Sequence, residues 1–247
     1  MTLTIGGLCS GIGGLELGLE RSGLGRTVWQ VERDPYCRSI LAQHWPEATR
    51  YEDITATDWS TVEHVDIVCG GIPCQPFSYG GNRGGVDDER WIWPAAVECL
   101  RVVRPDFFLL ENVAALLTDD SDAFGTVLAD LSALGFDAEW SVVSACSVGA
   151  PHTRDRVFVL AYRSGAHVPG EVPSDRRQAA GAGEPRGSRR STRGDGWLPE
   201  PPMDRVAHGV PSRLVRDPLH ALGNAVVPAV AEAVGHHILT HVAKAAA

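Results

Sequence analysis

Apolar runs typical of strands alternate with amphipathic stretches over the first 162 residues. Apolar residues recur three and four positions apart in the expected helices, whereas the expected strands are short and continuously apolar. The expected strands are Leu3–Leu8, Thr27–Glu32, Val65–Cys69, Phe107–Leu110, Ala138–Ser144 and Arg156–Tyr162. The expected helices are Gly14–Ser22, Pro35–His44, Trp91–Val103, Ser121–Leu134 and a last one from Pro228 to about His241. This alternation predicts an α/β fold, with helices on both faces of a mostly parallel sheet.

The pattern changes after residue 163, where Gly, Pro, Ser and Arg replace the periodic apolar positions. A segment with so little apolar content cannot form its own core, so we expect residues 164–203 to be flexible and irregular. The sequence therefore suggests three parts: residues 1–163, residues 164–203, and a C-terminal segment, 204–247, that returns to the first part.

Charge is distributed unevenly along the chain. The net charge is -9, yet residues 163–216 carry ten Arg against six acidic residues, a local charge of +4. Lys244 is the single lysine, which leaves the body of the chain without a residue for a pyridoxal Schiff base or a P-loop. The 6 cysteines form no C-x-x-C pair, and no apolar run reaches the ~20 residues of a membrane span. We therefore expect a cytoplasmic protein without a membrane segment.

The first motif, SGIGG at residues 10–14, joins the first expected strand to a helix. Glycines in this position let a nucleotide approach the backbone closely. An NAD fingerprint would need a third glycine where Glu16 stands, so the looser form used for S-adenosylmethionine is favoured. Glu32, after the second strand, would bind the ribose hydroxyls, and Asp53 the adenine amino group. A glycine-rich turn without a ligand is the structural alternative.

Two other cysteine-based chemistries are excluded by the sequence. Residues 7–11 (GLCSG) have the form of a nucleophile elbow, but no strand precedes them to supply an oxyanion hole. A zinc deaminase would need a second cysteine at position 77, which is Phe77, and the chain contains no H-x-E.

Cys74 stands between two prolines just after an expected strand. Ligands of open α/β sheets bind at the carboxyl ends of the strands. A lone cysteine is more often a small buried hydrophobe, but the glycine-rich continuation from Tyr79 to Gly85 opposes that interpretation.

The segment GIPCQPFS at 71–78 resembles the Pro-Cys motif of the C5-cytosine DNA methyltransferases. Further segments are similar to motifs of that family and follow its order: SGIGG at 10–14, ENV at 111–113, HTRDR at 152–156 with His in place of Gln, and LGNAVVP at 222–228. Two positions depart from the family: Cys9 replaces its usual Phe, and Arg33 replaces an apolar or aromatic residue. The resemblance covers residues 3–162 and about 204–240.

The resemblance implies a Rossmann-like S-adenosylmethionine-dependent methyltransferase fold with a reduced target-recognition region. It also implies DNA methylation at C5 of a cytosine that is flipped out of the duplex, as part of a restriction–modification system. S-adenosyl-L-methionine would be the cofactor and S-adenosyl-L-homocysteine the product, with no metal. The implied cofactor-binding residues are Ser10, Gly11, Ile12, Gly13, Gly14, Glu32, Asp53, Ile54, Pro73, Asn224, Ala225 and Val226.

The implied catalytic residues are Cys74, Glu111, Arg154 and Arg156. The Cys74 thiolate would add to C6 of cytosine and make C5 nucleophilic. Glu111, with a pKa raised by burial, would protonate N3. Arg156 would neutralise charge at O2, with Arg154 as a second cation. As structural alternatives, Glu111 and Asn112 could cap a helix, and the two arginines could lie on a solvated edge strand.

Double-stranded DNA is the expected substrate. The expected DNA-contacting residues are Gln75, Ser78, Arg83, Arg176, Arg177, Arg189, Arg190, Arg193, Arg205 and Arg213. Those between 176 and 193 would contact mainly phosphates, and Arg205 and Arg213 would read bases. We expect a monomer whose partner is a restriction endonuclease or another specificity protein. Two alternatives stay open: the same chemistry on a structured RNA, and a non-catalytic nucleic-acid-binding relative.

Overall fold

A computed structural model describes residues 2–73, 91–119, 122–163 and 212–245. The Pro-Cys motif from Cys74 onward and the irregular region 164–203 lie outside these residues, and the backbone alone is described for Arg213. The other expected residues outside the described part are Gln75, Ser78, Arg83, Arg176, Arg177, Arg189, Arg190, Arg193 and Arg205.

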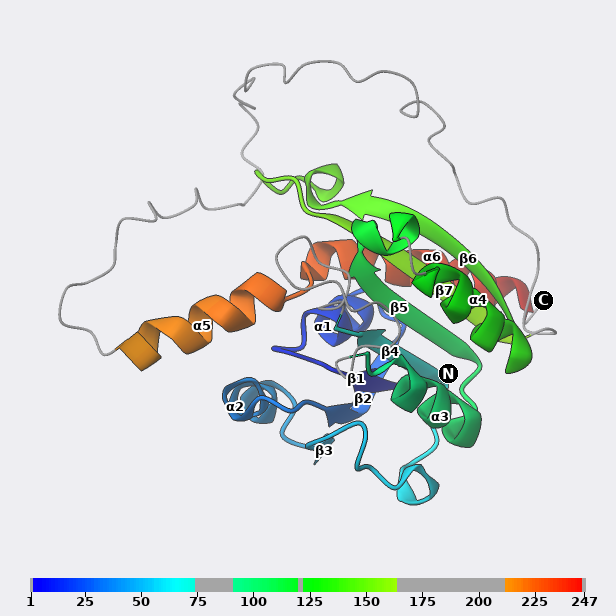
Figure 1. Ribbon diagram of the computed structural model, residues 1–247, viewed down its shortest axis with the longest axis horizontal. Helices are drawn as coiled ribbons and strands as arrows, with labels where there is room; N and C mark the ends of the chain where they lie inside the picture. The colour runs from blue at the N-terminus through cyan, green and yellow to red at the C-terminus, as the bar shows by residue number, and fades with distance from the viewer. Residues whose placement is uncertain (1, 74–90, 120–121, 164–211, 246–247) are drawn as a thin grey trace, which may run out of the picture.

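The described chain forms a seven-stranded sheet in the order β3-β2-β1-β4-β5-β7-β6 (Figure 1). The strands are β1 (Leu3–Leu8), β2 (Gly25–Val31), β3 (Thr49–Tyr51), β4 (Ile67–Gly71), β5 (Phe107–Val113), β6 (Phe136–Ser144) and β7 (Asp155–Arg163). Neighbours among β1 to β5 are parallel, and β7 is antiparallel to both β5 and β6. This confirms the expected α/β class.

The helices are α1 (Gly14–Arg21), α2 (Pro35–His44), α3 (Trp93–Val103), α4 (Ala123–Ala133), α5 (Ser212–Asn224) and α6 (Pro228–Ala245). Short 3-10 turns are η1 (Trp59–Thr61), η3 (Ala114–Thr118) and η4 (Ala145–Val148). Helix α3 begins at Trp93 rather than Trp91, and Pro94 lies in its first turn, where proline is tolerated.

The structure contains elements that the apolar pattern missed. Strand β3 has three residues and no buried position, so it carries no hydrophobic signal. Helix α5 holds Pro218 in its interior, a residue that argues against a helix. Strand β5 continues to Val113 instead of ending at Leu110, which places Glu111 and Asn112 within the sheet.

Two helical layers cover the sheet. On one face, Leu15 and Leu19 of α1 and Ile238 of α6 pack with Ile67 of β4 and Leu109 of β5. On the other face, α3 and α4 cover the sheet, and their shared core includes Trp93, Leu100, Val127, Leu131 and Phe108. The indole Nε1 of Trp93 donates a hydrogen bond of 2.8 Å to Asp130 Oδ2 and joins α3 to α4.

The strand order reverses between β1 and β4, which are neighbours at the centre of the sheet. Open α/β sheets bind ligands beyond the carboxyl ends of strands at such a point. In the register, Leu8 pairs with Gly70 and Gly71 with Glu111. The ends of β1, β4 and β5 therefore meet at one edge.

Helix α6 approaches α1 very closely through glycines. A β-carbon at Gly14 would collide with the carbonyl oxygen of Val226, and one at Gly18 would collide with Ala231 and the carbonyl oxygen of Pro228. This close packing brings the segment between α5 and α6 against the start of α1.

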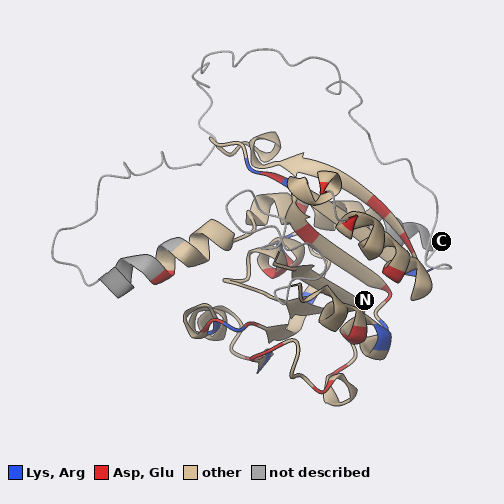
Figure 2. Ribbon diagram, in the orientation of Figure 1, with Lys and Arg blue, Asp and Glu red and all other residues tan. Residues whose placement is uncertain are grey.

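Within the described residues, no helix is long and apolar enough to cross a bilayer. Figure 2 shows acidic positions distributed over several helices and strands.

We predict that Gly18→Ala lowers the free energy of unfolding by about 1–3 kcal/mol, the usual cost of overpacking. Gly223→Ala is the matched control, because a β-carbon there would meet nothing within 4 Å and both glycines lie in helices. Urea denaturation of the two variants measures the difference. Equal stability would show that the α1–α6 contact tolerates a methyl group.

Candidate active site

The loop between β1 and α1 has an unusual backbone. Cys9, Gly11 and Gly13 have φ values of 51°, 56° and 83°, in the left-handed region that favours glycine. The backbone N–H of Gly11 donates to Glu32 Oε2 at 2.7 Å, and Glu32 Oε1 accepts from the N–H of Asp34 at 2.7 Å. Glu32, the residue after β2, therefore fixes the backbone of the loop at Gly11. Its two oxygens still have lone pairs for further donors.

The loop residues fit a nucleoside cofactor. A β-carbon built on Gly11 meets no atom within 4 Å, so there is open space in front of its backbone. Asp53 lies close enough to contribute to the raised pKa of Cys9, and its own pKa is lowered by hydrogen bonds from Thr55. Ile54 beside it is buried. Glu32 and Asp53 are thus both near the loop, as a ribose and an adenine would require.

Cys9 is not a nucleophile in this setting. Burial, followed by the charges of Glu32, Asp53 and Glu16, raises the pKa of its thiol to about 12. A protonated thiol reacts slowly, which agrees with the exclusion of a cysteine hydrolase.

A small cavity of about 30 Å³ lies between this loop and the segment that follows α5. Its lining includes Ser10, Gly11, Glu16, Asn224 and Ala225. Residues from near the two ends of the sequence thus share one cavity wall, as the resemblance implies for the cofactor-binding set.

Glu111 and Arg156 form an ion pair at the same edge of the sheet. Arg156 Nε lies 3.0 Å from Glu111 Oε1, and the two side chains are 21% and 10% exposed. Burial raises the pKa of Glu111 above its usual value, and the charges of Arg156 and Arg154 act in the opposite direction. The carboxyl group therefore holds a proton more readily than an exposed glutamate.

The structural alternatives for these residues are wrong. Strand β7 lies between β5 and β6 and is therefore an interior strand rather than an edge strand. Glu111 pairs with Phe158 inside the sheet and does not cap a helix.

Asn112 has a positioning contact that the sequence did not reveal. Its Nδ2 donates a hydrogen bond of 3.1 Å to the carbonyl oxygen of Ile72. Ile72 follows β4 and precedes the exposed Pro73, the residue before Cys74 in the sequence. Asn112 therefore fixes the backbone at Ile72, two residues before Cys74 in the sequence.

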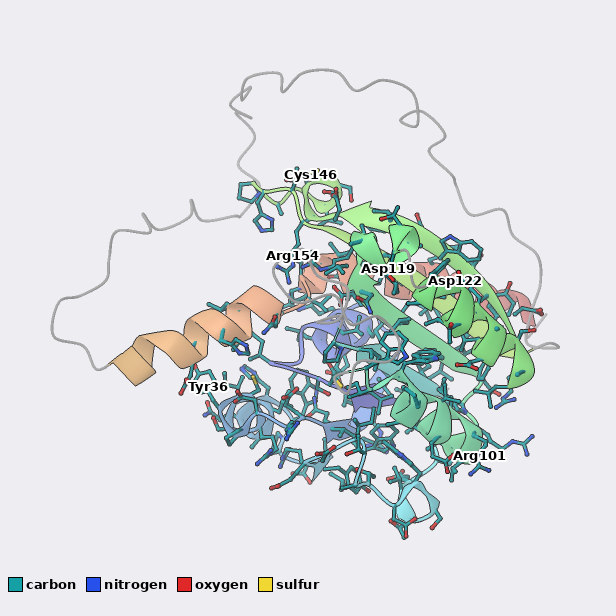
Figure 3. All side chains as sticks on the ribbon, viewed as in Figure 1. Tyr36, Arg101, Asp119, Asp122, Cys146 and Arg154 are labelled. Carbon is teal, nitrogen blue, oxygen red and sulfur yellow. The ribbon has the colours of Figure 1, made fainter. Side chains whose placement is uncertain are left out.

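Arg154, labelled in Figure 3, is the residue just before β7. Its Nη2 donates to the carbonyl oxygens of Gly223 and Ala225 at 2.9 and 3.0 Å. Arg154 thus contacts the C-terminal segment directly, whereas Arg156 contacts Glu111.

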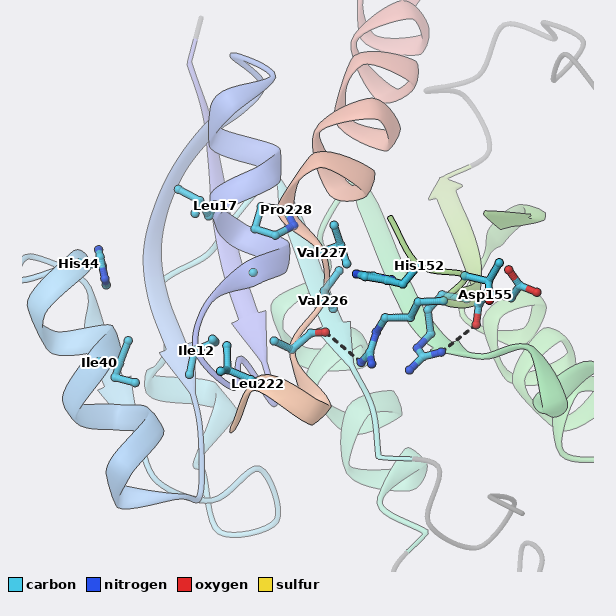
Figure 4. Close-up of a pocket in the computed structure, with 15 residues that line it drawn as sticks. Ile12, Leu17, Ile40, His44, His152, Asp155, Leu222, Val226, Val227 and Pro228 are labelled. Atoms are coloured by element: carbon cyan, nitrogen blue, oxygen red, sulfur yellow. Dashed lines mark hydrogen bonds between the residues drawn. The ribbon is translucent and has the colours of Figure 1, made fainter. Parts of the chain in front are cut away.

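A larger pocket of about 860 Å³ adjoins the contact between Arg154 and the C-terminal segment. In Figure 4, Ile12, Leu17, Ile40 and His44 face His152 and the C-terminal segment across it. The pocket is roomy enough for a ligand of nucleoside size. No cluster of three metal-ligating side chains occurs among the described residues.

Comparison with known proteins agrees with this geometry. Residues 3–182 match the model of the C-5 cytosine-specific DNA methylases. The Type II methyltransferase M.NgoBI of Neisseria gonorrhoeae is 35% identical over 179 residues, which cover 72% of this chain and 55% of that protein. M.HaeII of Haemophilus aegyptius, also a Type II methyltransferase, is 33% identical over 162 residues, 65% of this chain and 50% of that protein.

A solved structure of a DNMT2 mutant from Spodoptera frugiperda is similar, with a TM-score of 0.56 and 25% identity over 66% of this chain and 50% of that one. The chain thus spans about half the length of these relatives. The fold is that of the S-adenosylmethionine-dependent methyltransferases, and the chain belongs to the C-5 cytosine-specific DNA methylase family.

Proposed function

We propose that this protein transfers a methyl group from S-adenosylmethionine to C5 of cytosine in double-stranded DNA. The observation that carries the proposal is the ion pair between the buried Glu111 and the partly buried Arg156. It lies at the same sheet edge as the glycine loop and directly beside the strand that leads into the Pro-Cys motif.

The cofactor would bind between the glycine loop and the C-terminal segment. Gly11 provides close backbone approach, Glu32 accepts hydrogen bonds from the ribose hydroxyls, and Asp53 binds the adenine amino group. Asn224, in the wall of the small cavity, faces the same space. When bound, the cofactor supplies an electrophilic methyl group on a sulfonium.

Cys74 would activate the cytosine ring, which has to leave the duplex to be reached. Its thiolate forms a bond to C6, and the displaced electron pair makes C5 nucleophilic. After C5 has taken the methyl group, a base removes the C5 proton, and the electrons of that C–H bond expel the thiolate from C6.

Glu111 and Arg156 would stabilise the ring while Cys74 is attached to it. Addition at C6 moves negative charge toward N3 and O2, and a carboxyl with a raised pKa can give N3 a proton. Arg156 offers a cation for O2 and holds the Glu111 side chain at 3.0 Å. The hydrogen bonds from Arg154 to Gly223 and Ala225 would hold the C-terminal segment, which would bind the cofactor, at a fixed position relative to Glu111 and Arg156.

The remaining expectations concern DNA. The arginines between 176 and 193 would bind phosphates, Arg205 and Arg213 would contact bases, and a restriction endonuclease or specificity protein would be the partner. The same chemistry on RNA is the competing function. Side-by-side methyl transfer to duplex DNA and to tRNA separates the two, and exclusive transfer to tRNA would replace DNA as the substrate.

Replacement of Cys74 by Ser is expected to abolish methyl transfer and leave cofactor binding intact, because the thiolate attacks C6 but is not needed in the glycine loop. The wild type should form a denaturation-resistant adduct with DNA containing 5-fluorocytosine, since fluorine cannot leave as a proton does. Cys146→Ser, at an exposed thiol, is the control and should retain both properties. An active Cys74→Ser variant, or an active wild type without an adduct, would contradict the mechanism.

Glu111→Gln should slow turnover by about 10²-fold or more, the scale of general acid catalysis, because an amide cannot protonate N3. Single-turnover methylation at saturating DNA measures the effect, and circular dichroism checks the fold. A rate within a few-fold of wild type would assign Glu111 a structural role.

The ion pair makes a separate prediction about stability and pH. Folding raises the pKa of this carboxyl. The free energy of unfolding therefore falls as the pH rises from the pKa of the carboxyl in the unfolded state to its pKa in the folded state. Arg156→Met removes the nearer of the two charges that oppose this rise. It should therefore lower the free energy of unfolding by about 1–3 kcal/mol near pH 7.5, the usual cost of leaving a buried polar group without its partner, and by less near pH 5.

Urea denaturation at both pH values measures this loss. The double variant Arg156→Met with Glu111→Gln should recover stability at pH 7.5, because no buried charge is left unpaired. A loss that is equal at both pH values and is not recovered in the double variant would show that the pair is not electrostatically coupled.

A further inference from the structure

Glu16 is a buried acid that the proposed reaction does not use. It lies in the first turn of α1 and is 1% exposed. Neither carboxylate oxygen has a hydrogen-bond partner among the described residues, and the hydroxyl of Ser10 beside it has none either. A buried polar group without a partner is costly, so its retention calls for an explanation.

The backbone opposite Glu16 leaves room for its carboxylate. A β-carbon at Gly7 would collide with Glu16 Oε1 and would crowd the Ser10 hydroxyl. Glycine at the end of β1 thus allows the carboxylate from α1 to occupy a place beside the loop.

Glu16 also lines the small cavity next to the glycine loop, together with Asn224 and Ala225. The carboxylate therefore stands at the wall of a space where the cofactor would lie, and its two oxygens have unused acceptor capacity.

The charges around Glu16 are negative. Burial raises the pKa of Glu16 to about 7, with smaller contributions from the charges of Glu20 on the same helix and Glu32 after β2. The Ser10 hydroxyl and the backbone N–H of Glu16 are near enough to lower this pKa in part, although neither meets the geometry of a hydrogen bond to the carboxylate. The thiols of Cys9 and Cys69 face the same region and are kept protonated by burial. None of the described residues that act on the carboxylate is a cation, so a cationic ligand would supply the missing partner.

We propose that the Glu16 carboxylate binds the α-ammonium group of the methionine part of S-adenosylmethionine. This inference rests on the proposed function, and it assigns a cofactor-binding residue outside the glycine motif. An ammonium group has three N–H donors, enough to satisfy both Glu16 oxygens at once. Charge-assisted hydrogen bonds of this kind are short and strong.

The assignment is tested by calorimetric titration of the full chain with S-adenosylhomocysteine and with its analogue that lacks the α-amino group. Glu16→Gln should weaken the binding of S-adenosylhomocysteine at least tenfold, on the scale of a charge-assisted contact. It should leave the binding of the deamino analogue unchanged. Glu20→Gln is the matched control on the same helix, since Glu20 accepts hydrogen bonds from Thr27 and Trp45 and should retain affinity.

Two further readouts separate binding from a structural role. The wild type should bind S-adenosylhomocysteine several-fold more weakly at pH 6 than at pH 7.5, because Glu16 then carries a proton in the free protein, whereas Glu16→Gln should lose this dependence. In the free protein, Glu16→Gln should unfold at the same or a higher urea concentration, because it removes a buried unpaired charge.

Each outcome has a definite meaning. If Glu16→Gln binds both compounds as the wild type does, or if it loses stability with unchanged affinity, Glu16 is a structural acid and the assignment is wrong. If the wild type binds S-adenosylhomocysteine but does not distinguish it from the deamino analogue, the assignment fails and the proposed function stands. A wild type that binds neither compound would overturn the proposed function and this inference with it.

Discussion

The close contact between α1 and α6 is the constraint on which the candidate site depends. Gly14 and Gly18 let α6 and the segment before it approach without a side chain between them. As a result, residues 224–226 from late in the chain close over a loop formed by residues 9–13 (Figure 1). The cavity beside Glu16 exists because these two segments meet.

A second constraint comes from the direction of β7. Because β7 runs antiparallel to β5, its first residues lie next to the carboxyl end of β5. Arg156 can therefore pair with Glu111 at the edge of the sheet where the parallel strands end. Arg154, two residues earlier, contacts the C-terminal segment instead. One short stretch of chain thus connects the acid that would protonate the base with the segment that would hold the cofactor.

Sequence patterns were sufficient for the order and type of most elements, since long apolar runs and amphipathic periods are local signals. They failed at β3, which buries no residue, and at α5, where Pro218 argues against a helix. The motif residues were named from the sequence because their segments resemble the motifs of a known family. What each side chain touches could not be predicted, because those contacts join distant segments: Asn112 to Ile72 and Arg154 to Gly223.

Glu16 illustrates the same limit. In the sequence, Glu16 is only the residue that departs from a dinucleotide fingerprint. In the structure it is a buried acid without a hydrogen-bond partner among the described residues. Burial and the absence of partners depend on β1, α1 and the C-terminal segment together, so no local pattern can reveal them.

The central claim is that the loop after β1 and the segment before α6 form one cofactor site. Hydrogen–deuterium exchange of the full chain with and without S-adenosylhomocysteine tests it most directly. The account predicts that amides of residues 9–14 and 222–228 become protected together at the same ligand concentration. Protection of one segment without the other, or protection confined to other elements, would contradict it.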